Sequence, residues 1–199
     1  MSWPNRVTFA RLLLLPLFLI CLLRAREEPS VRWVTFALFV LMATGDFLDG
    51  MLARRLGQSS ALGAFLDPLA DKLTMTSAVI LLAIRDVTAG WIEYPIPSWL
   101  AVLVVWRDAT IVIGYLLMSL SLGAAEVRAS RTGKATTVAQ MLLVVATLGS
   151  PALPQQAASV VVRGLWYVVA GLTAASALGY VRQGLARAAG VQEESKRES

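Results

Sequence analysis

The residues with the clearest chemical potential are four aspartates in apolar surroundings. Asp46 and Asp49 stand in LFVLMATGDFLDG, and Asp67 and Asp71 stand in LGAFLDPLADKLTMTSAVILLAI. On insertion scales a carboxylate at the centre of a membrane helix costs roughly 2.5–3.5 kcal/mol, so four unpaired carboxylates would cost on the order of 10 kcal/mol. A bound cation is the obvious compensation. These aspartates are therefore the first candidates for an active site.

Helical spacing places these acids on two faces. Positions three, four, seven and eight after Asp46 share one face of a helix, and Gly63, Asp67 and Asp71 share another at i, i+4 and i+8. Two antiparallel helices joined by a short turn would point both aspartate pairs at one place. Hard carboxylate oxygens favour Mg²⁺ or Mn²⁺, and we expect two ions. Zinc is disfavoured because it prefers His and Cys ligands.

Small residues and one arginine complete these faces. Gly50, Ala53 and Gly63 remove side chains where a bulky ligand must approach the helices, although each could equally be a small residue of helix packing. Arg54 offers a fork of donors for a phosphate. Positive-inside anchoring is the alternative for Arg54, and it is the interpretation that we adopt for Arg55.

The elements that must position these residues are long apolar helices. The chain has 199 residues, 57% of them hydrophobic, with a mean hydropathy of +0.65. Apolar runs of about 17–25 residues match the thickness of a bilayer. The pattern predicts an all-α polytopic membrane protein with a short amphipathic N-terminal helix and one bundle of six spans. We expect a membrane domain over residues 1–186 and a polar, frayed tail over 187–199; the predicted spans are 9–23, 31–51, 60–84, 98–121, 135–150 and 159–181.

Several chemistries are excluded by composition. The chain has no histidine, which rules out His-based triads and His nucleophiles, and its single Cys21 cannot form an intrachain disulfide. No cleavable signal peptide is evident. Lys and Arg gather in 54–55, 128–134 and 182–197, on the side of the N-terminus. This bias predicts that both termini and the aspartates face the cytoplasm in the cytoplasmic membrane. The charge of +5 suits anionic lipid rather than nucleic acid.

The complete pattern resembles the signature of the CDP-alcohol phosphatidyltransferase family, DxxDGxxARx₈GxxxDxxxD. Every specified position matches between Asp46 and Asp71. The resemblance implies an enzyme that moves a phosphatidyl group from a CDP-linked lipid to an alcohol and releases CMP. It also implies a homodimer. In this resemblance Asp46, Asp49 and Asp67 are metal ligands and Asp71 is both a ligand and the catalytic base. The residues that would line the CDP site are Gly50, Ala53, Arg54 and Gly63.

Flanking sequence resembles the phosphatidylglycerophosphate synthase and cardiolipin synthase branches. The segments that carry this resemblance are Pro4-Asn5-xx-Thr8-xx-Arg11-xxxx-Pro16, GAFLDPLADK and Gly133-Lys134-xx-Thr137-xx-Gln140. The acceptor would then be glycerol-3-phosphate or phosphatidylglycerol. Each bears a phosphate, and the candidates to bind it are Arg107, Arg131 and Lys134. For Arg131 and Lys134 the alternative is positive-inside anchoring, and for Arg107 it is a structural contact with Asp108.

The choice of acceptor stays open at this level. Phosphatidylglycerophosphate synthases usually carry Arg-Glu followed by a second Arg, whereas this chain has Arg107-Asp108 and Tyr115. In this respect the chain is more like the cardiolipin synthases, which use phosphatidylglycerol. The glycerol-3-phosphate enzyme is the commoner bacterial member, however, and we adopt glycerol-3-phosphate as the acceptor for that reason. A cation transporter is the alternative of a different class, because intramembrane acids mark ion paths. It gives no reason for the small residues and Arg54 at their spacings.

Overall fold

The fold is entirely helical in the residues that the structure describes. The computed structural model describes the backbone of residues 3–56, 61–122 and 131–197, and the side chains of 12–45, 72–113 and 132–180. The all-α prediction is confirmed for these ranges. The elements are α1 (Trp3–Arg24), α2 (Pro29–Leu56), α3 (Ala61–Ala83), α4 (Arg85–Thr88), α5 (Ser98–Leu122), α6 (Arg131–Gly149), the 3₁₀ turn η1 (Ser150–Ala152) and α7 (Gln155–Arg197).

The six long helices follow the six predicted spans, but both ends of the chain differ from expectation. The N-terminal segment forms no separate amphipathic helix, because α1 runs unbroken from Trp3 to Arg24. At the other end, α7 continues to Arg197, where a frayed tail was expected from residue 187. The tail is rich in Ala, Gln, Glu, Lys and Arg, which favour helix, so it extends α7 without an apolar face.

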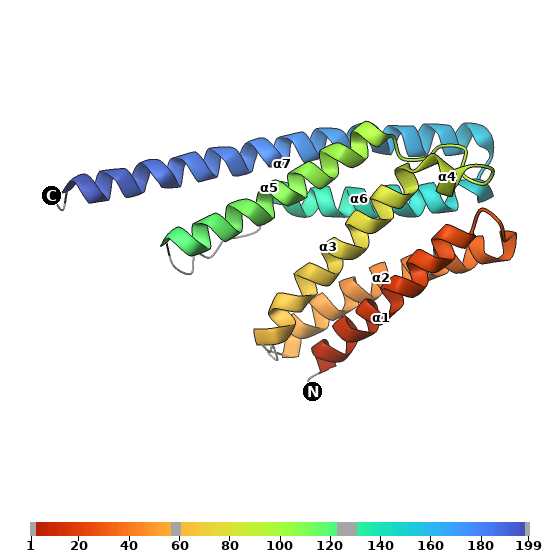
Figure 1. Cartoon of the computed structure of the whole chain (residues 1–199), viewed down its shortest axis with the longest axis horizontal. Helices are drawn as coiled ribbons and strands as arrows, with labels where there is room; N and C mark the ends of the chain where they lie inside the picture. The colour runs from red at the N-terminus through yellow and green to blue at the C-terminus, as the bar shows by residue number, and fades with distance from the viewer. Residues whose placement is uncertain (1–2, 57–60, 123–130, 198–199) are drawn as a thin grey trace.

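Helices α1, α2 and α3 form one part of the bundle. Phe18 and Leu22 of α1 are fully buried, and the ring of Phe18 lies 5.6 Å from that of Phe39 in α2, centroid to centroid. The α1–α2 turn is fastened by Arg32, whose Nε donates to the carbonyl of Ala25 at 2.8 Å. The end of α2 and the start of α3 lie close together (Figure 1). The two aspartate-bearing helix segments therefore meet at this end of the molecule.

Helices α5, α6 and α7 form the other part of the bundle. α7 packs along α6 and against α5, and it projects far beyond both at its C-terminal end (Figure 1). α6 also contacts α2 and α3, which joins the two parts. At Gly149 the chain approaches α2 closely, since a Cβ there would lie 3.2 Å from the ring of Phe36. A larger side chain at this position would push the end of α6 away from α2.

An ordered cap of residues 84–97 lies at the end of α3 farthest from the aspartates. Ile96 donates its backbone N–H to Leu82 at 3.1 Å, and the Trp91 indole donates to the carbonyl of Val87 at 2.8 Å. Gly90 makes the turn with a φ of 81°, a conformation that L side chains rarely adopt. The guanidinium of Arg32 stacks over Trp91 at 5.8 Å. The cap thus seals this end with buried side chains.

We expect Trp91→Ala to destabilise the fold without touching the chemistry. The substitution removes a buried indole, its hydrogen bond and its contact with Arg32, so a loss of about 3 kcal/mol is expected. The measurement is the free energy of unfolding in mixed detergent micelles. Trp99→Ala is the matched control, because Trp99 is 51% exposed. Equal stability of the two variants would contradict the structural role of the cap.

The outward surface of the helices is strongly apolar. Val102, Trp106, Val160 and Tyr167 are each at least 68% exposed. Among the described residues, Thr132–Ala152 and Gln155–Tyr180 are long and apolar enough to cross a membrane, and Leu12–Arg24, Pro29–Gly45 and Lys72–Ala83 are shorter apolar helices. Such a surface suits hydrocarbon better than water. The presence of six spans stays a prediction.

Candidate active site

The predicted donor site occupies facing ends of α2 and α3. The C-terminal half of α2 carries Asp46, Asp49, Gly50, Ala53 and Arg54, and the N-terminal half of α3 carries Gly63, Asp67 and Asp71. Both segments are helical, as the spacing argument requires, and their ends meet in space (Figure 1). The side chains of all eight residues lie outside the described side chains. The convergence of the aspartates on one point therefore stays a prediction.

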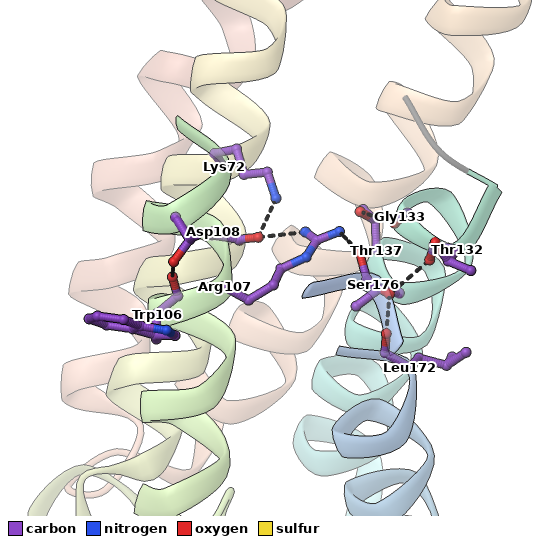
Figure 2. A network of polar contacts seen from close by, with 11 residues as sticks. Lys72, Trp106, Arg107, Asp108, Thr132, Gly133, Thr137, Leu172 and Ser176 are labelled. Carbon is purple, nitrogen blue, oxygen red and sulfur yellow. Dashed lines mark hydrogen bonds and ion pairs between the residues drawn. The ribbon is translucent and has the colours of Figure 1, made fainter. Parts of the chain in front are cut away.

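Within the described side chains, polar chemistry concentrates where α3, α5 and α7 meet. Lys72 reaches from α3 and Arg107 from α5 toward the carboxylate of Asp108 (Figure 2). The Lys72 Nζ lies 2.7 Å from Asp108 Oδ1, and the Arg107 guanidinium lies 2.6 Å from the same oxygen. One carboxylate oxygen thus binds two cations from different helices.

Arg107 also joins α5 to α7. Its second terminal nitrogen donates to the hydroxyl of Ser176 at 2.8 Å, and its guanidinium stacks over the Tyr180 ring at 5.9 Å. Arg107 is 3% exposed. Among the described residues, its Nε has no hydrogen-bond partner. The structural contact with Asp108, left open by the sequence, is therefore confirmed, and Arg107 is held firmly by its neighbours.

The other two predicted acceptor ligands lie on the first turns of α6. Arg131 begins that helix, and its side chain is outside the described ones. Lys134 is exposed. Next to it, Thr137 bonds to the carbonyl of Gly133 at 3.2 Å, and Gln140 is buried at 1% exposure. Thr136 donates to the carbonyl of Leu172 at 3.2 Å and so links α6 to α7.

Sequence reasoning missed the partner of Lys72. Lys72 lies in the apolar run 60–84 and was not among the predicted site residues, although a lone cation in apolar surroundings needs a counter-ion. That need was the available signal. The partner itself lies 36 residues away on α5, so only the packing of α3 against α5 identifies it. Ser176 and Tyr180 carried no comparable signal.

Comparison with known proteins settles the family. A model of the CDP-alcohol phosphatidyltransferase family matches residues 1–177, which is most of the chain. The chain belongs to this family. The matched range includes both the signature between Asp46 and Asp71 and the buried pair Arg107–Asp108 of α5. The resemblance inferred from the aspartate signature is confirmed.

Relatives with assigned names fall into two branches of the family. A CDP-diacylglycerol–glycerol-3-phosphate 3-phosphatidyltransferase of Bacillus subtilis is 34% identical over 73% of this chain and 75% of that protein. The protein of the same name from Escherichia coli is 32% identical over 89% of this chain and 92% of that protein. A probable cardiolipin synthase (CMP-forming) of Drosophila melanogaster is 31% identical over 91% of this chain and 57% of that protein. These are the two branches that the flanking sequence resembled.

Proposed function

We propose that this CDP-alcohol phosphatidyltransferase is a glycerophospholipid synthase that uses CDP-diacylglycerol as donor and glycerol-3-phosphate as acceptor, with release of CMP. The observation that carries the proposal is the complete donor signature on α2 and α3 within a chain whose family is established. The acceptor follows the names of the relatives in Bacillus subtilis and Escherichia coli. The protein would act in the cytoplasmic membrane with six spans, both termini and the active site on the cytoplasmic side, and as a homodimer.

The donor set fits Mg²⁺ or Mn²⁺. Asp46, Asp49, Asp67 and Asp71 offer only carboxylate oxygens, which hard divalent ions prefer, and they stand on two helices whose ends adjoin. These four residues would hold two ions. When bound, the ions neutralise the pyrophosphate charge that would otherwise repel a nucleophile.

The remaining steps are assigned to residues of this chain. Gly50, Ala53 and Gly63 leave room for the CDP group, and Arg54 binds one of its phosphates. Asp71 accepts the proton of the acceptor hydroxyl, since the chain has no histidine for this role. The hydroxyl oxygen attacks the phosphorus next to diacylglycerol, the bond from that phosphorus to the CMP phosphate breaks, and CMP leaves. Arg107, Arg131 and Lys134 are the proposed ligands of the acceptor phosphate.

Phosphatidylglycerol is the second candidate acceptor. It is favoured by the Arg107–Asp108 pair, which differs from the Arg-Glu of phosphatidylglycerophosphate synthases, and by the similarity to the Drosophila protein. A cation transporter is not supported. The family model and the names of the relatives favour transfer of a phosphatidyl group instead. Glycerol-3-phosphate and phosphatidylglycerol remain the two acceptors to compare.

An acceptor panel tests the proposal. Purified protein with a divalent ion and CDP-diacylglycerol is expected to release CMP when glycerol-3-phosphate is supplied, and the product is identified by mass spectrometry. Phosphatidylglycerol, inositol phosphate and serine are run in parallel. CMP release with phosphatidylglycerol alone would move the protein to the cardiolipin synthase reaction. CMP release with none of the four alcohols would contradict the enzyme assignment.

A further inference from the structure

The contact between α3 and α5 contains more positive than negative side chains among the described residues. Two cations, Lys72 and Arg107, share one carboxylate, that of Asp108, through the same oxygen. The side chains of Arg107 and Asp108 are 3% and 8% exposed, and that of Lys72 is 33% exposed. Charges removed from water to this degree are costly unless they are paired. Counted over the described side chains, the trio therefore carries one surplus positive charge that an anion can balance.

The positive charge is more accessible to a ligand at Lys72 than at Arg107, because their side chains are 33% and 3% exposed. Both terminal nitrogens of Arg107 already bind partners, one on Asp108 and one on Ser176. An ammonium group has three donors, and Asp108 takes one of those of Lys72. With one third of its side chain exposed and Asp108 as its partner among the described side chains, Lys72 has donors that can reach a ligand. Asp108 fixes where these donors lie.

The position of the trio relates it to the acceptor. Lys72 directly follows Asp71, the proposed base, on α3. The base must lie beside the acceptor hydroxyl, and both candidate acceptors carry a phosphate. Of the residues proposed for CDP, three lie on α2 and only Gly63 lies on α3, whereas the trio joins α3 to α5 and α7. An anion at Lys72, where α3 meets α5, is therefore assigned to the acceptor.

We infer that Asp108 is a positioning residue for the acceptor: it holds Lys72 beside Arg107 so that the ammonium group of Lys72 binds the acceptor phosphate. The inference rests on the proposed function. Loss of the Asp108 charge frees Lys72 and leaves the partly exposed Lys72 and the buried Arg107 without the carboxylate between them. Acceptor binding then weakens, whereas CDP-diacylglycerol binding changes little. A merely structural tie between α3 and α5 would affect both substrates and the stability alike.

The test compares steady-state kinetics of Asp108→Asn, Asp108→Glu and Lys72→Gln with those of the wild type. Asp108→Asn and Lys72→Gln are expected to raise the KM for glycerol-3-phosphate about tenfold or more, the effect of losing a hydrogen bond to a charged group. The KM for CDP-diacylglycerol should stay near the wild-type value. Asp108→Glu keeps the charge and should restore most of the acceptor affinity. Asp86→Asn is the matched control, because Asp86 is an exposed residue of the cap, and it should leave both KM values unchanged.

A double variant shows whether Asp108 and Lys72 affect acceptor binding through one interaction or independently. Because Asp108 acts through Lys72, Lys72→Gln combined with Asp108→Asn should raise the acceptor KM little beyond either single change. If Asp108→Asn does not fold, Lys72→Gln at the partly exposed position provides the test. It should raise the KM for glycerol-3-phosphate and leave the KM for CDP-diacylglycerol near the wild-type value. An unchanged acceptor KM in Lys72→Gln, or equal changes in both KM values, would overturn the inference. No CMP release from the wild type would instead contradict the proposed function.

Discussion

Replacing Asp67 with asparagine is expected to abolish CMP release while leaving a folded protein in the membrane. Asparagine keeps the size of the side chain and removes the negative charge that a divalent ion requires. Replacing a residue that only hydrogen-bonds to a metal ligand typically lowers metal affinity or activity about 10–100-fold. Replacing a ligand itself should therefore lower turnover by more than about a hundredfold. The measurement is CMP release at saturating CDP-diacylglycerol and acceptor.

The control for this prediction is a second Asp→Asn change outside the site. Asp86 is exposed in the cap, at the end of α3 opposite to the aspartates, so Asp86→Asn should retain wild-type turnover. Membrane insertion and the size-exclusion profile in detergent show whether each variant is folded. Turnover of Asp67→Asn at the wild-type rate would remove Asp67 from the site. Loss of turnover in both variants would point to instability rather than to chemistry.

The helices were predictable because their signal is local. Runs of apolar residues of membrane length gave the positions of α2, α3 and α5 to within a few residues. The ends were less predictable. The amphipathic character of the N-terminal residues suggested a separate helix. No residue there interrupts the helix, however, so these residues are the first turns of α1. Local propensity extends helices where an argument from hydrophobicity stops them.

The polar contacts of α5 could be predicted from the sequence only where the partners are neighbours in the chain. Arg107 and Asp108 are neighbours in sequence, so their contact could be stated as an alternative. Lys72 and Ser176 are 36 and 69 residues from their partners. Which cation meets which anion depends on how α3 and α7 rotate against α5, and a single sequence does not specify that rotation. The structure therefore adds Lys72 to the polar contacts of α5.

The donor site has the opposite character. Its aspartates were predicted from residue type and spacing alone, because a carboxylate in an apolar helix is costly and the spacing places the carboxylates on common helix faces. The C-terminal end of α2 and the N-terminal end of α3 lie close together, as this prediction requires (Figure 1). The acceptor half lacks such a pattern. Its residues are scattered over α3, α5 and α6, so the distinction between glycerol-3-phosphate and phosphatidylglycerol needs experiment.

Removal of divalent ions is expected to bring CMP release to background, and Mg²⁺ or Mn²⁺ should restore it. Without the ions, four carboxylates and a pyrophosphate would crowd negative charge into one apolar site, which opposes donor binding. The assay is CMP release after treatment with a chelator, followed by titration with each ion. Zn²⁺ should restore little activity, because the site offers neither His nor Cys. Full activity in the presence of chelator would contradict the metal assignment.

A direct binding measurement makes this prediction independent of turnover. Electron paramagnetic resonance of Mn²⁺ is expected to report two ions per chain in the wild type and weaker binding in Asp67→Asn. The Asp108→Asn variant should bind Mn²⁺ like the wild type, since Asp108 is paired with Lys72 and Arg107 and belongs to the acceptor half. Weakened Mn²⁺ binding in Asp108→Asn would mean that the two halves of the site share their charges. Equal binding in all three proteins would remove the aspartates from the metal site.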